Sequence, residues 1–517
     1  MSHTVTRSPS RTLLVLTASF LAGIIAHAFD ETRWSAVTAL FLGGCLSAAA
    51  AVLRRQNASQ CLLLACLTLF VWGLVRYDTA LPSGHDPRLP EGEMMGFEGV
   101  AAEVPRRGLY RTEVELDRVV SVSTDETMPG RWRLDLLSPA TVAYGDRLTW
   151  TCQPRNVLFG SDGFDTRLYL HGIRFRCRPR DPPTVIGSDE GHPLLGVIYA
   201  IKVQFQEAVF DLYPDPEASF LLGLLMGSRE GIPDRLTEDF RMTGTSHILA
   251  VSGYNVTQLI RIAVVLAALC AIPRRRASAG VAVLVLCFAL LVGDDASVVR
   301  ASIMGSVAVL ATLCGRLYGG FIALSVAAAV MLAFNPLILR HDVGFQLSFC
   351  AVWGLYAFGE RFTAAMTDRP FLSRTLLRTA AETLAATLAT LPVILLTFGR
   401  FPLGAPLVNI MVLPLLPFIM AGGLVSASLH LIHGSLGWLT ATVTFALLRW
   451  EISVVTVASR LLPPPLEMRA TPLQTGLMYL FLMAVWLSLS DRRRSDLATV
   501  RGATVWMTDT TDGRRLR

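Results

Sequence analysis

Long apolar runs separated by short polar stretches dominate this chain. Three such runs come first, and nine more fill most of the sequence from residue 246 to residue 490. The runs lie at about 13–29, 35–53, 61–77, 246–272, 279–293, 298–315, 320–334, 343–358, 381–398, 406–430, 436–458 and 472–490. A membrane-spanning helix needs about 17–25 predominantly apolar residues. The pattern therefore predicts a polytopic α-helical membrane protein with about twelve (eleven to thirteen) transmembrane helices.

A polar region separates the third run from the fourth. Its apolar side chains alternate with polar ones, as in 112–116 and 132–136. This alternation predicts strands with one buried face, and a compact all-β barrel of about five or six strands fits the length. The predicted organisation has five parts. They are N-terminal transmembrane helices at 1–80, a β domain at 85–190, short amphipathic or re-entrant helices at 195–245, a transmembrane domain at 246–490 and a tail at 491–517.

Composition agrees with a membrane protein, and the placement of arginine predicts its orientation. Only 17% of the residues are charged, against about a quarter in soluble proteins, and the net charge of +6 is carried almost wholly by arginine. The arginine clusters between runs fall on the cytoplasmic side if the N-terminus is cytoplasmic, as the positive-inside rule requires. These clusters lie at 54–55, 274–276, 316, 369–378 and 492–494. The same parity predicts an exported β domain and two cytoplasmic termini.

Two cysteines stand apart from the other seven, which lie in apolar runs. Cys152 and Cys177 each continue the apolar face of a predicted strand in the exported domain. Exported compartments are oxidising, so we expect a Cys152–Cys177 disulfide, with two free buried thiols as the alternative.

The polar face of the strand that contains Cys177 is basic. It carries Arg174, Arg176, Arg178 and Arg180, within a stretch, 131–180, that holds nine arginines and four acids. Such a surplus suits the phosphate backbone of DNA. A solvated face near anionic lipid headgroups is the equally open alternative.

The segment "SHILAVSGYNV" at 246–256 is unusually polar for an apolar run. If 247–261 is one helix, then His247, Tyr254, Gln258 and Arg261 share one face, with Asn255 beside it. Polar groups in a membrane helix should face a bundle interior or an aqueous path, so we expect either a wet path or a structural hydrogen-bond network.

Other predicted spans carry polar residues as well. Arg300 either snorkels to the interface or pairs with Asp294, Asp295 or Glu382, and Glu451 beside Trp450 suggests an interfacial position. No HExxH, GxSxG, Walker or CxxC motif and no metal-ligand cluster occurs in the sequence. We therefore expect no catalytic residues, no metal and no cofactor.

Several motifs resemble one family in order along the chain. "GTSHILAVSGYNVTQLI" resembles the signature of the ComEC competence-protein family, and "ASVVRASIMGSVAVLA" and "NPLILRHDVGFQLSFCAVWGL" follow it. Upstream, "YGDRLTWTCQP" and "DGFDTRLYLHGI" resemble the family's exported OB-fold domain. The resemblance implies a channel in the cytoplasmic (inner) membrane that passes one DNA strand during natural transformation. The channel residues that it implies are His247, Ser252, Gly253, Tyr254 and Asn255, with Arg300, Gln346, Glu382 and Asn409 as companions.

The chain also departs from the family pattern. Asn255 stands where the family motif has a second histidine, which argues against titration or metal binding there. Many members continue into a metallo-β-lactamase-like domain, whereas this sequence ends about 27 residues after its last run without HxHxDH. We therefore expect no nuclease activity from this chain.

The resemblance also implies partners. They are single-stranded DNA, membrane lipid, a DNA receptor, a cytoplasmic helicase and a separate nuclease; the oligomeric state stays open. A small-solute or lipid transporter with an exported accessory domain is the alternative function. A membrane hydrolase that uses Ser252 and His247 is a third.

Overall fold

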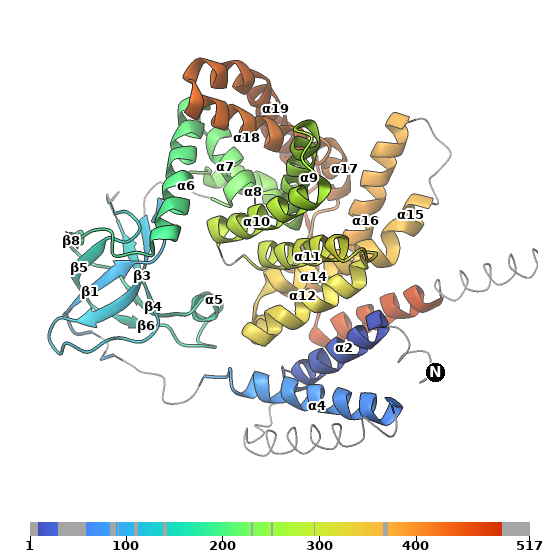
Figure 1. Cartoon of the computed structure of the whole chain (residues 1–517), viewed down its shortest axis with the longest axis horizontal. Helices are drawn as coiled ribbons and strands as arrows, with labels where there is room; N and C mark the ends of the chain where they lie inside the picture. The colour runs from blue at the N-terminus through green and yellow to red at the C-terminus, as the bar shows by residue number, and fades with distance from the viewer. Residues whose placement is uncertain are drawn as a thin grey trace, which may run out of the picture. The chain divides into compact units, whose positions relative to one another are not determined.

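The computed structural model contains one β-sheet domain and many helices (Figure 1), and its chain divides into two compact units. The first comprises residues up to Ser348 together with Leu407–Pro463, and the second comprises Phe349–Pro406 and the chain from Pro464 onward. The structure describes residues 9–28, 58–82, 89–90, 92–107, 112–137, 142–228, 231–249, 252–293, 295–364 and 371–488. The predicted span at 35–53 and the predicted tail at 491–517 therefore lie outside the described residues.

One sheet makes up the predicted β domain. Its strands are β1 (Met95–Ala101), β2 (Arg106–Arg107), β3 (Thr112–Ser121), β4 (Arg131–Leu136), β5 (Arg147–Cys152), β6 (Arg155–Asn156), β7 (Ile173–Cys177) and β8 (Thr184–Gly187). The order is β6-β7-β4-β3-β1-β5-β8, with β2 beside β3. The pair β4–β7 is parallel and the other pairs are antiparallel. The sheet has more strands than the five or six expected. The additional strands β2 and β6 are too short to show an alternating sequence pattern, and β8 is exposed along most of its length and so has no buried face to produce one.

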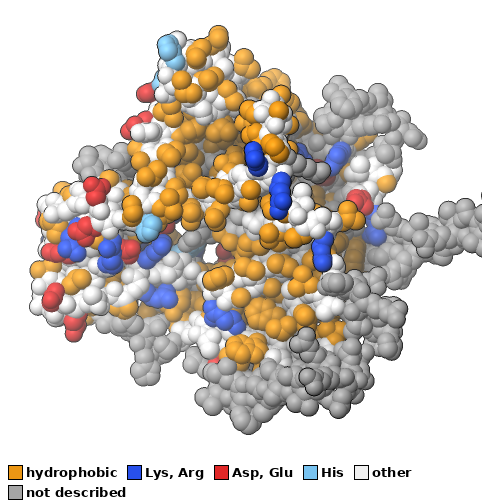
Figure 2. Space-filling view, viewed as in Figure 1, with side chains coloured by type: hydrophobic (Ala, Val, Ile, Leu, Met, Phe, Trp, Pro, Cys, Tyr) orange, Lys and Arg blue, Asp and Glu red, His pale blue; other side chains and the backbone are white. Residues whose placement is uncertain are grey.

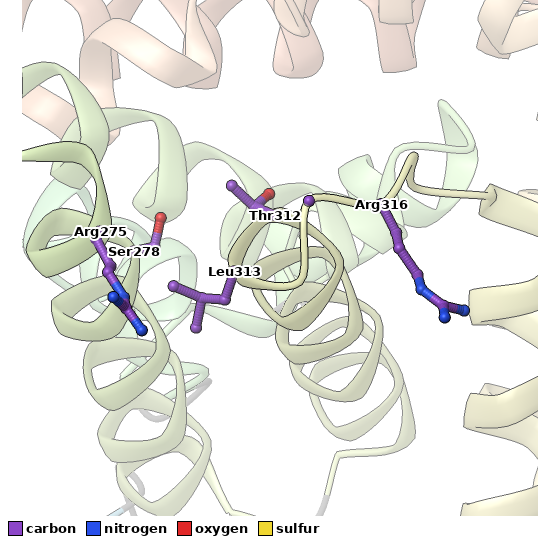
Figure 3. Close-up of a pocket in the computed structure, with 6 residues that line it drawn as sticks. Arg275, Ser278, Thr312, Leu313 and Arg316 are labelled. Atoms are coloured by element: carbon purple, nitrogen blue, oxygen red, sulfur yellow. The ribbon is translucent and has the colours of Figure 1, made fainter.

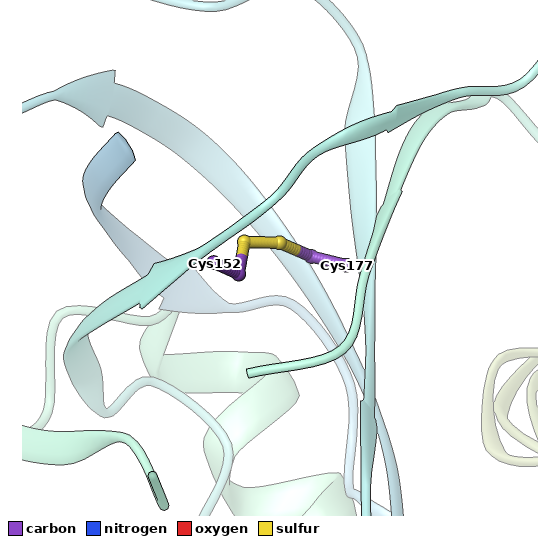
Figure 4. Close-up of a disulfide and its surroundings, with 2 residues drawn as sticks. All are labelled: Cys152 and Cys177. Atoms are coloured by element: carbon purple, nitrogen blue, oxygen red, sulfur yellow. A yellow bond between two sulfur atoms is a disulfide. The ribbon is translucent and has the colours of Figure 1, made fainter. Parts of the chain in front are cut away.

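Aromatic side chains fill the interior of this sheet domain. The Trp132 ring lies 4.5 Å from that of Phe97 and 4.7 Å from that of Phe175, between centroids. The structure joins Cys152 and Cys177 in a disulfide with the two Cα atoms 6.2 Å apart (Figure 4). In the sheet order, β7 and β5 are separated by β4, β3 and β1. The disulfide therefore connects two strands that share no hydrogen bonds, across the core of the domain.

Helices form the rest of the described chain. Unit 1 contains α2 (Pro9–Ala28), α4 (Ala58–Asp78), α5 (Gly163–Leu170), α6 (Pro193–Leu212), α7 (Glu217–Met226), α8 (Asp234–Met242), η1 (Ser246–Ile248), α9 (Gly253–Leu269), α10 (Arg274–Val292), α11 (Ala296–Leu313), α12 (Gly320–Phe334), α13 (Ile338–His341), α18 (Leu416–Ile432) and α19 (Gly434–Leu461). Unit 2 contains η2 (Leu355–Gly359), α15 (Glu360–Ala364), α16 (Phe371–Thr397), a two-stranded pair of β9 (Arg400–Phe401) with β10 (Leu466–Glu467), and the helix Pro472–Ser488. The helices α14 (Val343–Gly354) and α17 (Ala405–Val412) cross the boundary between the units.

Several helices are long and apolar enough to cross a membrane. Among the described residues these are Arg275–Val292, Ala296–Leu313, Leu377–Thr397 and Gly434–Leu461. The pair α17 and α18 makes a fifth if it counts as one span bent by 43°. Pro414 lies in this break and Pro417 in the first turn of α18. Proline cannot donate the hydrogen bond that a continuous helix would need at the break. The predicted fold class, a polytopic helical membrane protein with an inserted β domain, is confirmed.

Shorter apolar helices account for part of the larger predicted number of spans. They are Thr12–Ala28, Glu217–Met226, Gly253–Leu269, Gly320–Phe334 and Pro472–Ser488. Hydrophobic side chains cover much of the visible helical surface, whereas charged side chains gather on the sheet domain (Figure 2). The contrast is the one expected if lipid surrounds the helices and water surrounds the sheet.

The region 195–245 is only partly amphipathic. The helix α8 buries Leu236 and Phe240, and its remaining residues are polar except Met242. The helix α7, by contrast, is buried at every residue from Glu217 to Leu225. It lies in the main core of unit 1, which α6, α8, α18 and α19 also form.

Side chains connect the C-terminal ends of several helices in unit 1. Arg76 of α4 donates to the carbonyls of Ala333 and Phe334 at the end of α12. Arg340 donates to Ala28 O at the end of α2, over 2.9 Å. The sheet domain meets the same region, because Asn335 Nδ2 donates to Leu170 O over 3.1 Å.

The N-terminal end of α10 and the C-terminal end of α11 border a hollow of about 580 Å³. Arg275, Ser278, Thr312, Leu313, Gly315 and Arg316 line it (Figure 3). Two of the predicted cytoplasmic arginines therefore share one end of this helix pair.

Candidate functional site

The motif at 246–256 does not form one helix with the residues that follow. Residues 246–248 make a single 3₁₀ turn, and α9 begins only at Gly253, after Ser252 with extended backbone angles (φ −111°, ψ 165°). Serine and glycine favour a helix start over a helix interior. The predicted continuous stripe is therefore wrong. His247 lies exposed before the helix, Tyr254 and Arg261 are exposed on it, and Gln258 is buried.

Asn255 lies inside the helix packing. Only 3% of its surface is exposed, and its Nδ2 donates to the Leu224 carbonyl of α7 over 2.8 Å. Ser252 Oγ donates to Asn255 Oδ1 over 3.1 Å. The amide thus connects α9 to the buried helix α7, and both of its polar atoms are used.

Arg300 of α11 is buried with 5% of its surface exposed. Its Nη1 donates to the main-chain carbonyl of Ser348 in α14, and Ser297 Oγ donates to Ser348 Oγ over 3.0 Å. The guanidinium also lies against the start of α9, because a Cβ added at Gly253 would collide with Arg300 Nη2. Arg300 therefore does not snorkel to the membrane surface. Glu382, one acid considered for it, pairs instead with Arg378 on its own helix at 2.8 Å.

These side chains form a polar layer, here defined as Ser252, Asn255, Gln258, Ser297, Arg300 and Ser348. Hydrogen bonds join α9 to α7 and α11 to α14, and the packing of Arg300 against Gly253 brings the two pairs together. Gln258 Nε2 of α9 and Ser302 Oγ of α11 are buried and have no hydrogen-bond partner among the described residues. Buried polar atoms are normally paired with protein or water, so such atoms mark places where water or a ligand can bind.

Two further predicted residues lie elsewhere. Gln346 Nε2 donates to the carbonyls of Leu339 and Arg340, where it completes the end of α13. Asn409 is buried in α17, and its Oδ1 has no partner within the described part of the chain. Asp294, another acid considered for Arg300, lies outside the described residues.

The burial of Glu451 was not predicted from the sequence. It is 0% exposed in α19, and neither carboxyl oxygen has a hydrogen-bond partner among the residues that the structure describes. The predicted interfacial position is therefore wrong. Thr444, Leu448 and Val455 are buried as well. Their helical spacing from Glu451 could have shown that this residue lies on the buried face of α19.

The basic strand of the sheet domain is less free than its sequence suggests. The Arg174 guanidinium lies 3.6 Å from the Tyr169 ring centroid, and Arg176 pairs with Asp165 at 3.9 Å. Arg178 and Arg180 are exposed and make no ion pair within the described residues. Only the second pair is therefore fully available to a solution partner.

Acidic residues from the preceding stretch neutralise other arginines of the domain. The antiparallel pairing of β3 with β4 puts Glu113 diagonally opposite Arg133, with which it forms an ion pair, and Glu115 lies 3.6 Å from Arg131. Burial, reinforced by the nearby Glu103 carboxylate, raises the pKa of Glu115. The net positive surface of the sheet is smaller than the counts over 131–180 imply.

Among the described residues no cluster of three or more histidine, cysteine or acidic side chains could hold a metal ion. The chemistry that the polar layer offers is thus hydrogen bonding and one buried positive charge.

Comparison with known proteins places this polar layer within a recognised domain. The family model described as "Competence protein" matches residues 224–493. The chain is 26% identical over 246 residues to ComE operon protein 3 of Bacillus subtilis (strain 168), across 47% of this chain and 31% of that protein. It is 25% identical over 253 residues to the uncharacterized protein YcaI of Escherichia coli (strain K12), across 47% and 33%. The matched part thus spans about a third of each curated relative. No solved structure matches the chain.

Proposed function

Because the chain belongs to the competence protein family, we propose that it is a channel that passes one strand of DNA across the cytoplasmic membrane. The transport would occur during natural transformation. The observation that carries this proposal is the buried polar layer, which lies inside the family-matched region and contains Arg300. Buried polar and charged groups among membrane helices are costly, and they commonly mark the pathway of a polar substrate.

The chemistry of the layer suits a sugar–phosphate chain. Arg300 provides a positive charge that attracts phosphate, and the unused amide of Gln258 provides a donor. We assign His247 and Tyr254, both exposed near the start of α9, to the approach to this path. Asn255 and Gly253 would hold the path in shape, the first by its bond to α7 and the second by leaving room for Arg300.

The proposed orientation has the sheet domain exported and both termini in the cytoplasm. The helix ends that meet the sheet domain at Asn335 are those assigned to the outside by the arginine distribution. Arg275 and Arg316, assigned to the cytoplasm, share the hollow at the other end of α10 and α11. Both observations support the division into two sides that the arginine distribution predicts.

The exported sheet would act as an OB-like domain that receives DNA. The path β7-β4-β3-β1-β5, with its ends linked by the Cys152–Cys177 disulfide, supports a barrel-like closure. Arg178 and Arg180 would attract phosphate, whereas Arg174 on the Tyr169 ring and Arg176 beside Asp165 would shape the surface behind them. A DNA receptor, a cytoplasmic helicase and a separate nuclease are further proposed partners, since we assign neither strand degradation nor energy supply to this chain.

Complementation of a deletion strain tests the proposal. We expect the wild-type gene to restore transformation, and we expect Arg300→Ala to lower it at equal protein abundance in the membrane. Arg378→Ala, on an exposed arginine paired within its own helix, is the matched control. Normal transformation by the deletion strain would refute the channel. In that case, uptake of labelled small solutes or lipids by proteoliposomes would decide in favour of the transporter alternative.

A further inference from the structure

One aromatic side chain of the sheet domain is displayed to solvent. Phe164 lies in the first turn of α5 with 47% of its surface exposed. The rings of Phe97, Trp132, Trp150 and Phe175 in the same domain are buried. Phe164 is therefore not part of the aromatic core of the domain. An exposed ring of this size does not gain the free energy that its burial would provide.

Two arginines hold the Phe164 ring from the side of the sheet. The guanidinium carbons of Arg133 and Arg176 lie 5.6 Å and 5.2 Å from the ring centroid. These arginines are direct partners in the parallel pair β4–β7, so they project from the same face of the sheet. Both contacts thus come from the sheet, and the exposed surface of the ring faces away from it.

Neighbouring acids fix both arginines in place. Arg133 pairs with Glu113 and with Asp135, and Arg176 pairs with Asp165 of α5. Their charges are therefore largely neutralised, and their role is to orient the ring. A ring that is already immobilised loses little conformational entropy when a flat ligand stacks on it.

Two arginines with no acidic partner among the described residues are strand neighbours of Arg176. Arg155 of β6 is the antiparallel partner of Arg176, and it is exposed. Arg178 follows Arg176 by two residues, a spacing of about 7 Å on the same side of an extended chain. Proteins that bind single strands combine these elements, an aromatic platform for a base and cations for the adjacent phosphates.

We propose that Phe164, held by Arg133 and Arg176, is a stacking platform for an unpaired base of single-stranded nucleic acid, with Arg155 and Arg178 on the flanking phosphates. This inference rests on the proposed function and narrows its substrate. In a duplex the faces of the bases are covered by their neighbours, so an aromatic platform selects single strands over duplex.

The position of α5 suits delivery to the helices. Leu170, its last residue, accepts the hydrogen bond from Asn335 just after α12, and Phe159 packs on His341 at 4.7 Å between ring centroids. A strand held on Phe164 would be bound on the element that connects the sheet domain to the helical part of unit 1.

The test uses the full-length protein in nanodiscs and an oligonucleotide that carries 2-aminopurine, whose fluorescence falls when it stacks. We expect Phe164→Ala to weaken single-strand binding about tenfold, to abolish the quenching, and to leave the salt dependence of binding unchanged. Phe164→Trp should retain both, whereas Phe164→Leu, which keeps the apolar volume and guards against a folding defect, should behave like alanine. Leu158→Ala, at an exposed apolar side chain nearby in sequence, is the control.

Each of the other possible outcomes would overturn a specific claim. Salt-dependent binding that is insensitive to Phe164→Ala would overturn the platform and leave the proposed function standing. No binding by the wild type at low salt would overturn the proposed function itself. Equal losses for single strands and duplex would overturn the selectivity. Quenching of the added tryptophan of Phe164→Trp by brominated lipid would show that the ring contacts the membrane, and would overturn the platform as well.

Discussion

Replacement of Gly253 by alanine tests the geometry of the polar layer. The added Cβ would collide with Arg300 Nη2, and it would lie 3.4 Å from the Cβ of Ala301. Overpacking of this kind costs about 1–3 kcal/mol, and displacement of the guanidinium from Ser348 O endangers a hydrogen bond to a charged group worth about 1.5–3 kcal/mol. Relief of the conformational entropy of glycine offsets about 0.5–1 kcal/mol of this. We expect a net loss of about 2–4 kcal/mol in the free energy of unfolding.

The assay is unfolding of the purified protein by titration with a denaturing detergent, in parallel with transformation of the complemented deletion strain. Gly280→Ala is the matched control, because this helical glycine of α10 has no atom within 4 Å of an added Cβ. We expect Gly280→Ala to be neutral or slightly stabilising.

A double-mutant cycle isolates the cause. In an Arg300→Met background the added methyl of Gly253→Ala no longer meets the guanidinium, so its cost should fall below about 1 kcal/mol. The same cost in both backgrounds, or a Gly253→Ala protein as stable as the wild type, would refute the contact between the start of α9 and Arg300.

Three further predictions concern other parts of the chain. Cys152→Ser should remove the difference in gel mobility between reduced and oxidised protein and lower the stability of the sheet domain by about 2–4 kcal/mol; identical mobility of the wild type under both conditions would exclude the disulfide. Glu451→Gln should leave the stability unchanged or raise it, since an uncharged isostere avoids the cost of burying an unpaired carboxylate, and a clear loss of stability would instead point to a bound partner. Combined Arg178→Ala and Arg180→Ala should reduce the slope of log affinity against log salt for single-stranded DNA by about 1.4, and an unchanged slope would mean that neither side chain contacts phosphate.

Periodicity in the sequence was sufficient for the fold class but not for its details. The alternation in β4 continues in the structure as alternating burial, because each residue's face depends only on its own strand. The parallel pairing of β4 with β7 depends on contacts between distant segments, and no local pattern encodes it. The same limitation affected the charge argument. The pairing of β3 with β4 joins Arg133 to Glu113, which lies before residue 131 and was therefore left out of the charge count over 131–180.

The polar site was located from sequence, but its geometry was not. Asn255 of the motif meets another helix at Leu224, whereas His247 and Tyr254 are exposed. A helical wheel assumes a continuous helix, but α9 begins only at Gly253. The burial of Arg300 depends on Ser348, which is 48 residues away in sequence. Glu451 is the opposite case, since the positions of Leu448 and Val455 would have revealed its buried face.

The contacts at the helix ends have a consequence for the order of assembly. The last carbonyls of a helix have no partner within the helix itself, and here side chains from other helices act as their caps. Arg340 caps Ala28 across 312 residues, Arg76 caps the end of α12, and Lys202 caps Leu291 at the end of α10. During synthesis, α2 therefore waits for its donor until the chain has been made as far as α13, whereas α10 finds Lys202 already in place. A chain truncated before residue 340 would leave the end of α2 uncapped, so the first described helix can be completed only late in biosynthesis.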